Sequence, residues 1–313
     1  MTSLIEQAAQ RLEQLRQAGV AVPDVASAAS PEARPAPERS EPAVTSRRVE
    51  LDFDELNESG IVTPSAPRTV VADQFRVIKR PLIANAVGKG AATLKHGNLI
   101  MVTSAVAGEG KSFTSVNLAM SIAAELDHTV VLVDADVARP SVLRMLGLPP
   151  SAGLLDVLEG KAELSDVLLR TNVDKLTVLP SGTPHAKATE LLASDAMERL
   201  LDEMATRYPD RIVIFDSPPL LLTTESRVLA SHMGQIIVVV AAGRTQQSAV
   251  QQALDTIEAC PVRLLVLNKA RSESVGYGPG QGYGYGYGYG YDQAQESAVP
   301  GTAAEADAQR AGN

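Results

Sequence analysis

Residues 105–112, AVAGEGKS, place two glycines, a lysine and a serine at the spacing of a Walker A loop, with Ala105 replacing its first glycine. Glycines let backbone N–H groups surround phosphates, the lysine reaches the outer phosphates, and the Ser112 hydroxyl can bind Mg²⁺. An apolar run precedes the loop and a helical-period stretch begins at Ser112, as this motif requires. We therefore expect ATP and Mg²⁺ to bind here. The expected binding residues are Gly108, Glu109, Gly110, Lys111, Ser112 and Phe113.

Two further apolar runs end in aspartates that could hold and orient the metal ion. The run VVLVDAD ends with Asp134 and Asp136, and the run RIVIFD ends with Asp216. A spacing of two points Asp134 and Asp136 toward the same side if the strand geometry persists. A lone aspartate after a strand usually caps a turn or a helix. Two such strand ends downstream of one Walker A loop favour a functional site.

The elements that must position these residues form an alternating pattern. Apolar, strand-like runs occur at 98–104, 129–134, 176–180, 211–216, 235–241 and 263–268, and helical-period stretches occur at 112–126, 188–207 and 245–259. Buried strands that alternate with helices indicate a mostly parallel sheet covered on both faces. We therefore predict an α/β fold of the P-loop NTPase type over residues 70–272.

The segments outside this domain differ in composition. Residues 1–20 have apolar residues at helical spacing, which predicts an amphipathic helix that docks on its own domain or on a partner. Residues 21–69 are Ala/Pro-rich and then polar, which is typical of a linker. Residues 273–313 form an expected disordered tail, because glycine makes backbone ordering costly and few aliphatic residues are present.

That tail contains six of the seven tyrosines of the chain. They are Tyr277, Tyr283, Tyr285, Tyr287, Tyr289 and Tyr291. Gly/Tyr repeats also occur in adhesive low-complexity segments. Beside a nucleotide-binding loop, the interpretation as phosphate acceptors is favoured. About 23 residues separate Asn268 from Tyr291, which gives a reach of roughly 25–30 Å for a glycine-rich chain.

Composition excludes several classes of protein. A net charge of −9 and a pI near 5.1 argue against binding to nucleic acid or anionic lipid. One cysteine, Cys260, excludes an intramolecular disulfide framework, and the four histidines show no metal-binding spacing. No run approaches the ~20 apolar residues of a membrane-spanning helix, so we expect a cytoplasmic protein.

The Walker A loop, the Asp-x-Asp motif at 134–136, the aspartate at 216 and the C-terminal tyrosines together resemble the bacterial tyrosine autokinases, the BY-kinases. The resemblance covers about residues 70–292. It looks closest to the stand-alone cytoplasmic members associated with exopolysaccharide and exosortase gene systems. This family is related to the ParA and MinD ATPases. The resemblance implies an ATP- and Mg²⁺-dependent kinase that phosphorylates its own tyrosine cluster and regulates exopolysaccharide polymerisation or export.

The resemblance also implies residue roles. Lys111 and Ser112 would hold the phosphates and Mg²⁺, Asp136 and Asp216 would bind Mg²⁺ directly or through water, and Asp134 would accept the proton of the incoming phenol. Asn268 would lie beside the adenine. In addition, DQFRVIKR resembles an ExxRxxR oligomerisation motif, with Asp73, Arg76 and Lys79 on one helix face, free to pair with a neighbouring subunit.

Two features depart from the family pattern. Ala107 stands where proline is common, and Ala138 fills a position that is often arginine. Arg139 follows Ala138, and whether it replaces that arginine stays open. The loop also lacks the second, early lysine of ParA and MinD, which separates the kinase interpretation from that of a ParA/MinD-like ATPase switch. That switch, and a scaffold that assembles through its Gly/Tyr arm, stay open as alternatives.

By the same resemblance, the partners would be an inner-membrane polysaccharide co-polymerase as activator and a tyrosine phosphatase. The co-polymerase would recruit the kinase to the inner membrane. Further copies of the chain would form a homo-oligomer, for which a ring is one arrangement. Nucleic acid is not an expected partner.

Overall fold

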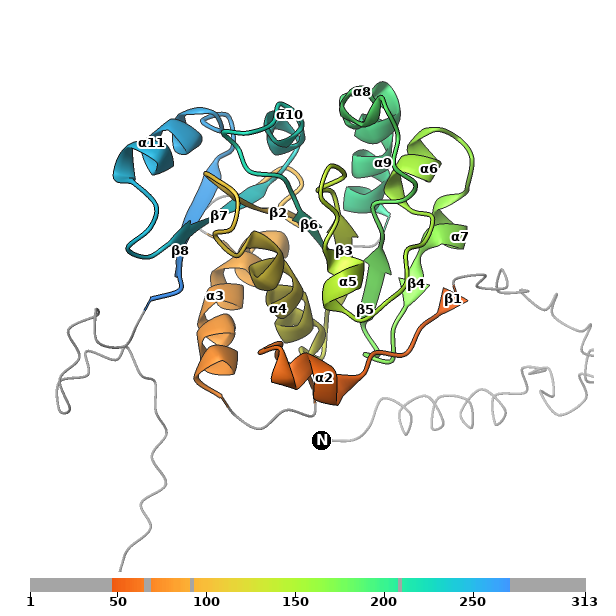
Figure 1. Ribbon diagram of the computed structural model, residues 1–313, viewed down its shortest axis with the longest axis horizontal. Coiled ribbons are helices and arrows are strands. Elements are labelled where there is room, and N and C mark those ends of the chain that lie inside the picture. The colour runs from red at the N-terminus through yellow and green to blue at the C-terminus, as the bar shows by residue number, and fades with distance from the viewer. Residues whose placement is uncertain (1–46, 65–68, 91–92, 208–209, 271–313) are drawn as a thin grey trace, which may run out of the picture.

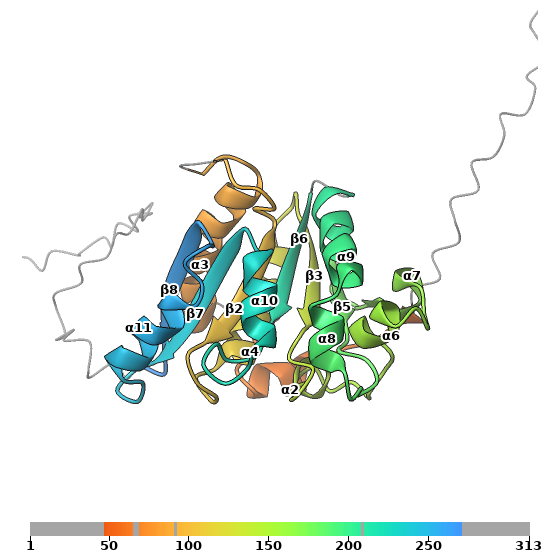
Figure 2. The ribbon, with the colours of Figure 1, turned by 90° about the horizontal axis from the view of Figure 1, so that it is seen from above.

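The computed structural model describes residues 47–64, 69–90, 93–207 and 210–270. The predicted N-terminal helix, the Ala/Pro-rich part of the predicted linker and the tyrosine cluster lie outside the described residues. Within these ranges, a central sheet lies between two layers of helices, as the views in Figures 1 and 2 show. The predicted α/β fold with helices on both faces is confirmed.

The sheet has eight strands in the order β1-β4-β5-β3-β6-β2-β7-β8. All adjacent pairs are parallel except β4 and β5, which are antiparallel. The six predicted strands are confirmed, and two short strands, β1 and β4, extend the sheet beyond β5. The strands are β1 (Arg47–Arg48), β2 (Leu99–Ser104), β3 (Thr129–Asp134), β4 (Leu169–Arg170), β5 (Leu176–Leu179), β6 (Arg211–Asp216), β7 (Gln235–Ala241) and β8 (Val262–Asn268).

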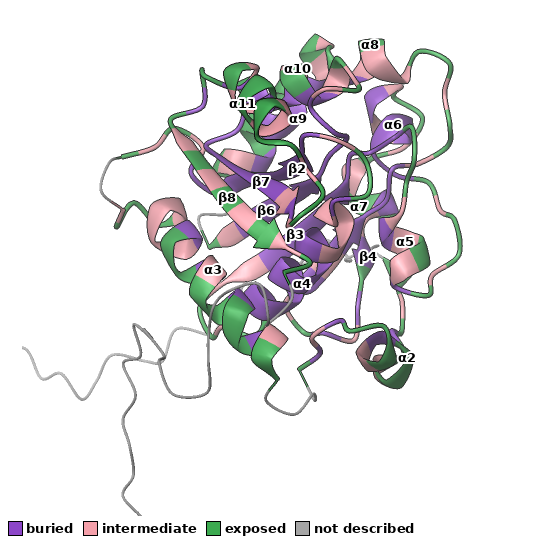
Figure 3. Cartoon of the chain, turned by 60° about the vertical axis from the view of Figure 1, so that its left-hand side comes forward, coloured by how far each residue is buried: buried purple, intermediate pink, exposed green. Residues whose placement is uncertain are grey.

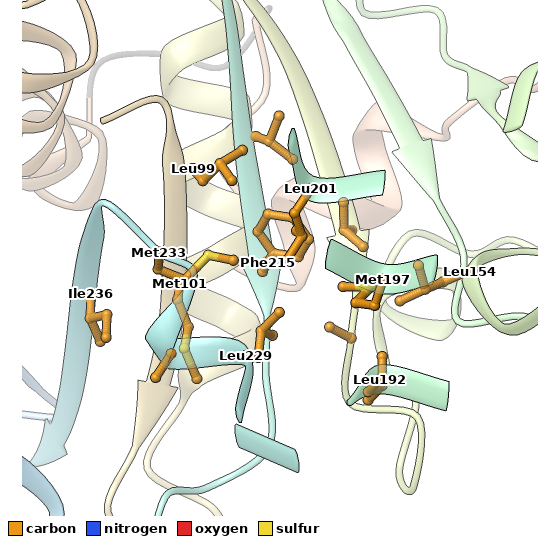
Figure 4. Packing of buried hydrophobic residues seen from close by; sticks show 14 of the residues in the cluster. Leu99, Met101, Leu154, Leu192, Met197, Leu201, Phe215, Leu229, Met233 and Ile236 are labelled. Carbon is orange, nitrogen blue, oxygen red and sulfur yellow. The ribbon is translucent and has the colours of Figure 1, made fainter. Parts of the chain in front are cut away.

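The central strands are apolar on both faces because each face is covered by helices. In β2, Leu99 and Met101 belong to one buried cluster, whereas Ile100 and Val102 belong to the other. Figure 4 shows the first cluster, in which Phe215 of β6 lies among side chains from the sheet and the helices. These two clusters hold the strand ends in register.

The helices divide between the two faces according to these clusters. One face carries α2 (Phe53–Glu58), α3 (Val70–Ala86), α4 (Lys111–Ala123) and α5 (Val142–Met145). The other carries α6 (Leu154–Leu158), α7 (Leu164–Val167), α8 (Ala188–Leu192), α9 (Asp195–Thr206), α10 (Glu225–Ser231) and α11 (Gln247–Asp255). The helical stretch predicted at 188–207 is two helices, because the Ser194 hydroxyl accepts from the Met197 N–H and caps α9.

Part of the predicted linker packs against the sheet. Leu51, Leu56 and Ile61 are buried, and Asn172 hydrogen-bonds both the N–H and the carbonyl of Leu51. The packed chain therefore begins before residue 70, the predicted start of the domain. The difference arises because these apolar residues are spread singly through a polar stretch and show no helical or strand period.

Strand β8 forms one edge of the sheet. Leu264 and Val266 pack against the core, whereas Leu265 and Leu267 point the other way and are 57% and 63% exposed. Figure 3 shows this alternation along β8. No helix within the described residues is long and apolar enough to cross a membrane.

Candidate active site

The predicted phosphate-binding loop, at residues 105–110, connects β2 to α4 and depends on two glycines. Gly108 and Gly110 have φ values of 81° and 103°, a region that side chains with a Cβ atom rarely adopt. A Cβ atom on Gly110 would also lie 2.1 Å from Nδ2 of Asn268. The loop therefore curls close to the last residue of β8, and a larger residue at Gly110 would displace the Asn268 amide.

Glu109 fixes the loop from inside the protein. Its carboxylate accepts hydrogen bonds from the Val106 N–H at 2.8 Å, the Ala241 N–H at 3.2 Å and the Thr245 hydroxyl at 2.5 Å. The residue is buried. The Glu109 side chain, which was expected to contribute to nucleotide binding, therefore joins the loop to the end of β7. No motif or spacing in the sequence indicates this contact, which spans more than 130 residues.

The end of β8 holds the loop from a second side. The Asn268 amide donates to the carbonyl of Glu109 at 2.9 Å, and Lys269 Nζ donates to the carbonyl of Gly108 at 2.6 Å. Asn268, expected beside the adenine, thus lies against the loop itself. Lys269 is a further residue at the loop that no sequence motif indicates, and its backbone has a positive φ of 59°, which is uncommon for a lysine.

Lys111, the first residue of α4, faces two of the predicted carboxylates. Its ammonium lies 2.6 Å from Oδ2 of Asp136 and 3.9 Å from Oδ1 of Asp216. The Ser115 hydroxyl donates to Asp216 at 3.1 Å. Because Asp134 and Asp216 are paired residues of the adjacent strands β3 and β6, all three carboxylates meet at one edge of the sheet.

Asp134 is held by the start of α5. Its Oδ2 accepts from the N–H groups of Ser141 and Val142, both at 2.9 Å. The hydroxyls of Ser141 and Ser112 lie 2.8 Å apart, which connects α5 to the phosphate-binding loop. Asp134 is therefore fixed in orientation beside the loop, with its other oxygen free of these bonds.

Burial sets the charge state of two carboxylates. Desolvation raises the pKa of Asp134 to about 7, and the charges of Asp216 and Asp136 add to this rise. Desolvation also raises the pKa of Asp216 to about 6, although Lys111 and the hydroxyls of Ser112 and Ser115 oppose it. The ligand-free site thus holds more negative charge than Lys111 alone can balance.

The donor set fits Mg²⁺. Oδ1 of Asp134 and Oδ2 of Asp216 are buried and have no hydrogen-bond partner, so a cation or a proton donor would satisfy them. Within the described ranges, no three His, Cys, Asp or Glu side chains form a metal cage on their own. Mg²⁺ commonly binds one or two carboxylates and completes its shell with water and substrate phosphates. The expected ligands Ser112, Asp136 and Asp216 suit that mode.

Two other predicted contributors have structural contacts. Phe113 packs against the core, and its ring lies near Gly60 at the end of α2. Arg139, which follows the Ala138 that departs from the family pattern, donates its backbone N–H to Oδ1 of Asp136 at 3.2 Å. Arg139 thereby helps to orient that carboxylate through its main chain.

The expected oligomerisation residues do not share one exposed face. Asp73 and Arg76 are exposed and pair with each other. Lys79 is only 4% exposed, and its ammonium lies 2.7 Å from Glu125 and donates to the carbonyl of Ser121. The expectation that Lys79 is free to pair with a neighbour is wrong, because this turn of α3 faces α4 and the lysine stem is buried between them.

The sequence of residues 97–268 matches the AAA domain family. Tyrosine-protein kinase YwqD of Bacillus subtilis (strain 168) is 30% identical over 205 residues, which are 66% of this chain and 83% of YwqD. Tyrosine-protein kinase CpsD of Streptococcus agalactiae is 31% identical over 187 residues, 58% of this chain and 80% of CpsD. Tyrosine-protein kinase ptk of Acinetobacter johnsonii is 33% identical over 184 residues, 58% of this chain, and the match spans a quarter of that longer relative.

Solved structures agree with the fold. The kinase domain of VpsO has a TM-score of 0.52 and 26% identity, and the match covers 65% of this chain and all of that domain. The chimerical protein CapA2B2 has a TM-score of 0.56 at 24% identity, with coverage of 72% of this chain and 93% of that one. Its likeness supports the fold alone.

Proposed function

Because the chain belongs to the bacterial tyrosine-protein kinases and has their AAA domain, we propose that it transfers the γ-phosphoryl group of ATP to tyrosines of its own C-terminal cluster. The observation that carries the proposal is the convergence of the phosphate-binding loop and three carboxylates. Lys111 lies within 2.6 Å of Asp136 and 3.9 Å of Asp216, and Asp134 is the strand partner of Asp216. Phosphoryl transfer requires this combination of positioning and charge.

The loop would bind the phosphates of ATP. Backbone N–H groups around Gly108 and Gly110, at the N-terminus of α4, favour negative charge. Lys111 would leave its ion pair with Asp136 and contact the β- and γ-phosphates. Mg²⁺, held by Ser112, Asp136 and Asp216, would offset the charge of the transferring group. Asn268, at the β8 side of the loop, would lie near the base.

Asp134 would accept the proton of the acceptor tyrosine. The phenol oxygen forms a bond to the γ-phosphorus while the bond from that phosphorus to the bridging oxygen of ADP breaks, and the phenol proton passes to Asp134. A tyrosine has a solution pKa near ~10, so a carboxylate beside it aids attack at neutral pH. The two N–H groups on Oδ2 leave Oδ1 of Asp134 as the proton acceptor.

We further propose that the phosphorylation state controls assembly in exopolysaccharide polymerisation or export. A phosphotyrosine adds about −1.5 to −2 charges, so six would add roughly −9 to −12 per chain. Chains that associate through docked tyrosines would then separate. An inner-membrane co-polymerase would recruit and activate the kinase, and a tyrosine phosphatase would reset it. Equal oligomer sizes for a fully phosphorylated sample and a Lys111→Met sample would refute this part.

The deciding experiment uses ATP labelled in the γ-phosphate. The full chain is compared with a variant that carries Tyr→Phe at the six tail positions and with Lys111→Met, each with and without the cytoplasmic segment of the co-polymerase. Label on tyrosine in the parent and its loss in both variants supports the proposal. Released phosphate without protein label would instead indicate a ParA/MinD-like ATPase, and neither signal would indicate a scaffold.

A further inference from the structure

Ser141 does not use its hydroxyl in the way that serine usually does at the start of a helix. It stands at the N-cap of α5, where a serine oxygen commonly accepts a hydrogen bond from a backbone N–H two or three residues later. The Ser141 side chain makes no such bond. Its hydroxyl instead donates to Oγ of Ser112, which lies 2.8 Å away and 29 residues earlier in the chain. A side chain that gives up a local bond for a distant partner indicates a role at that partner.

The start of α5 is capped by Asp134 instead. Oδ2 of Asp134 accepts from the N–H groups of Ser141 and Val142, both at 2.9 Å. These first N–H groups of the helix therefore have partners without the serine hydroxyl. As a result, Ser141 contacts the proposed proton acceptor through its main chain and the expected metal ligand Ser112 through its side chain.

The contacts of Ser112 account for both lone pairs of its hydroxyl oxygen. A hydroxyl has one proton and two lone pairs. Ser141 donates to this oxygen, and so does the Lys111 ammonium, which lies 3.3 Å away. The same ammonium lies 2.6 Å from Oδ2 of Asp136 and 3.9 Å from Oδ1 of Asp216. Lys111 thus lies among the three side chains that are expected to bind Mg²⁺.

Only one of these two contacts conflicts with a metal ion. Lys111 would turn to the phosphates of ATP, which frees the lone pair of Ser112 that it occupies. Ser141 is fixed by the backbone of α5, because its carbonyl accepts from the Met145 N–H at 2.9 Å and its own N–H is bound to Asp134. It can keep its bond to Ser112 while Lys111 leaves, so the freed lone pair keeps its direction.

We propose that Ser141 is a positioning residue of the kinase, whose hydroxyl orients Oγ of Ser112 toward the metal ion while its N–H orients Asp134. The inference rests on the proposed function and adds to it a residue that lies in neither the Walker A loop nor the Asp-x-Asp motif. Without this bond, the Ser112 hydroxyl is free to rotate and can turn its proton toward the cation. Loss of the Ser141 hydroxyl should therefore weaken metal binding and leave phosphate binding unchanged.

Ser141→Val and Ser141→Thr test the hydroxyl at nearly constant shape, because both side chains are branched at Cβ and only threonine has a hydroxyl. The readout is the binding of a fluorescent, non-hydrolysable ATP analogue to the full chain as Mg²⁺ is varied. Ser141→Val should raise the Mg²⁺ concentration for half-maximal binding about threefold to tenfold, which corresponds to the loss of one neutral hydrogen bond. Ser141→Thr should stay within about twofold of the parent. In EDTA, the Kd of the analogue should stay within about twofold in both variants.

Ser112→Ala completes a double-mutant cycle. With no Ser112 hydroxyl left to orient, Ser141→Val should have no further effect on the Mg²⁺ requirement. Ser141→Ala, compared with the parent, repeats the measurement without added bulk. Additive effects of Ser112→Ala and Ser141→Val would overturn the inference, and so would an equal Mg²⁺ requirement in Ser141→Val and Ser141→Thr.

Ser194→Ala is the matched control. The Ser194 hydroxyl caps α9 in the usual way, by accepting from the Met197 N–H. Its loss should lower the urea midpoint of unfolding without changing the Mg²⁺ requirement. A rise in the Mg²⁺ requirement of Ser194→Ala as large as that of Ser141→Val would show that general destabilisation causes the effect, and would overturn the inference.

Failure of this inference and failure of the proposed function give different results. The binding readout needs no phosphoryl transfer, so it tests the orientation of Ser112 even in a chain that forms no phosphotyrosine. A raised Mg²⁺ requirement in Ser141→Val without any phosphotyrosine in the parent would refute the kinase and leave the metal-positioning role of Ser141 intact. Phosphotyrosine in the parent with an unchanged Mg²⁺ requirement in Ser141→Val would support the kinase and refute the role of Ser141.

Discussion

The three aspartates of the site have the same chemistry in solution but different surroundings here. Asp136 forms an ion pair with Lys111, Asp216 accepts from Ser115, and Asp134 is held only by two backbone N–H groups. Desolvation raises the pKa of Asp134 to about 7. The carboxylate with no cation of its own is thus the one best placed to exchange a proton near neutral pH.

Asp134→Asn should make the ligand-free protein more stable at about pH 8. The pKa of Asp134 is higher in the folded than in the unfolded chain, so its stabilising effect is present below about pH 4 and is lost as the pH rises through about 7. A neutral amide keeps an acceptor for Ser141 and Val142 and removes this loss. Urea denaturation in EDTA should show a gain on the order of 1–3 kcal/mol at about pH 8, which shrinks toward about pH 4. A lower stability than the parent at about pH 8 would contradict the argument.

Glu109→Gln should weaken nucleotide binding without touching the nucleotide. The variant loses the charge that holds the Val106 and Ala241 N–H groups and the Thr245 hydroxyl, so the loop is less well positioned. We expect the free energy of unfolding to fall by about 1–3 kcal/mol and the Kd for ATP to rise. Thr245→Val serves as the partner of a double-mutant cycle. Additive effects on the Kd of the two changes would show that the contact does not position the loop.

At the scale of elements, α3 joins the body of the protein through a buried ion pair and presents a different pair to the outside. Lys79 and Glu125 are 2.7 Å apart, and the Lys79 side chain also bonds the carbonyl of Ser121 in α4. The proximity of Lys79 also lowers the pKa of Glu125, although burial opposes this. Arg76 and Asp73, about one and two turns before Lys79, remain exposed. The expected assembly motif is thus divided along α3: Lys79 attaches the helix to the protein, and only Asp73 and Arg76 are exposed to a neighbour.

Lys79→Ala should lower stability, and Arg76→Ala should not. Removal of one partner from a largely buried pair commonly costs about 3–5 kcal/mol, and because Glu125 is partly exposed we expect the lower end. An exposed pair such as Asp73–Arg76 contributes about 0–1 kcal/mol. Urea denaturation measures both, and sedimentation velocity reports the oligomer. If Arg76→Ala leaves the oligomer intact, the exposed part of the motif has no role in assembly.

The fold could be predicted from sequence because its strands are long apolar runs, and because the Walker A loop and the aspartates fall at strand ends. The contacts of Glu109 and Lys269 could not be predicted, since each joins residues more than a hundred positions apart. The burial of Lys79 could not be predicted, because sequence spacing shows which residues share a face of a helix but not which face packs against the rest of the protein. The division of residues 188–207 into two helices at Ser194 could not be predicted either, because the spacing of the apolar residues continues across Ser194.

At the scale of the whole molecule, the order of the strands sets the distance between the end of β8, which precedes the tyrosines in sequence, and Asp134. The strand β3, which ends at Asp134, lies four strand positions from β8. Neighbouring strands are about 4.8 Å apart, so the path along the sheet edge from β8 to Asp134 is roughly 19 Å. The tyrosine nearest to β8 in the sequence is therefore not the one best able to reach Asp134.

Tyr277 should be a poor acceptor within its own chain. Tyr277 stands seven positions after Ala270, and a glycine-rich segment of that length has an average reach of roughly 13–16 Å. Tyr291 stands 21 positions after Ala270, which gives a reach of roughly 23–27 Å. Mass spectrometry of dilute protein should find phosphate on Tyr283–Tyr291 before Tyr277. At high protein concentration, where one chain can phosphorylate another, the phosphorylation of Tyr277 should approach that of the other tyrosines. Equal rates for Tyr277 and Tyr291 at high dilution would contradict this geometry.

The exit of the chain from β8 also has a kinetic consequence. Under the proposed self-phosphorylation, a tyrosine on the same chain as its active site is present at an effective concentration in the millimolar range, however few molecules the cell contains. Lowering the protein concentration would then not slow the reaction, and the rate of the first modification should be independent of protein abundance. Control would come instead from the nucleotide, from an activator, or from a neighbouring chain whose tyrosines compete for the same active site.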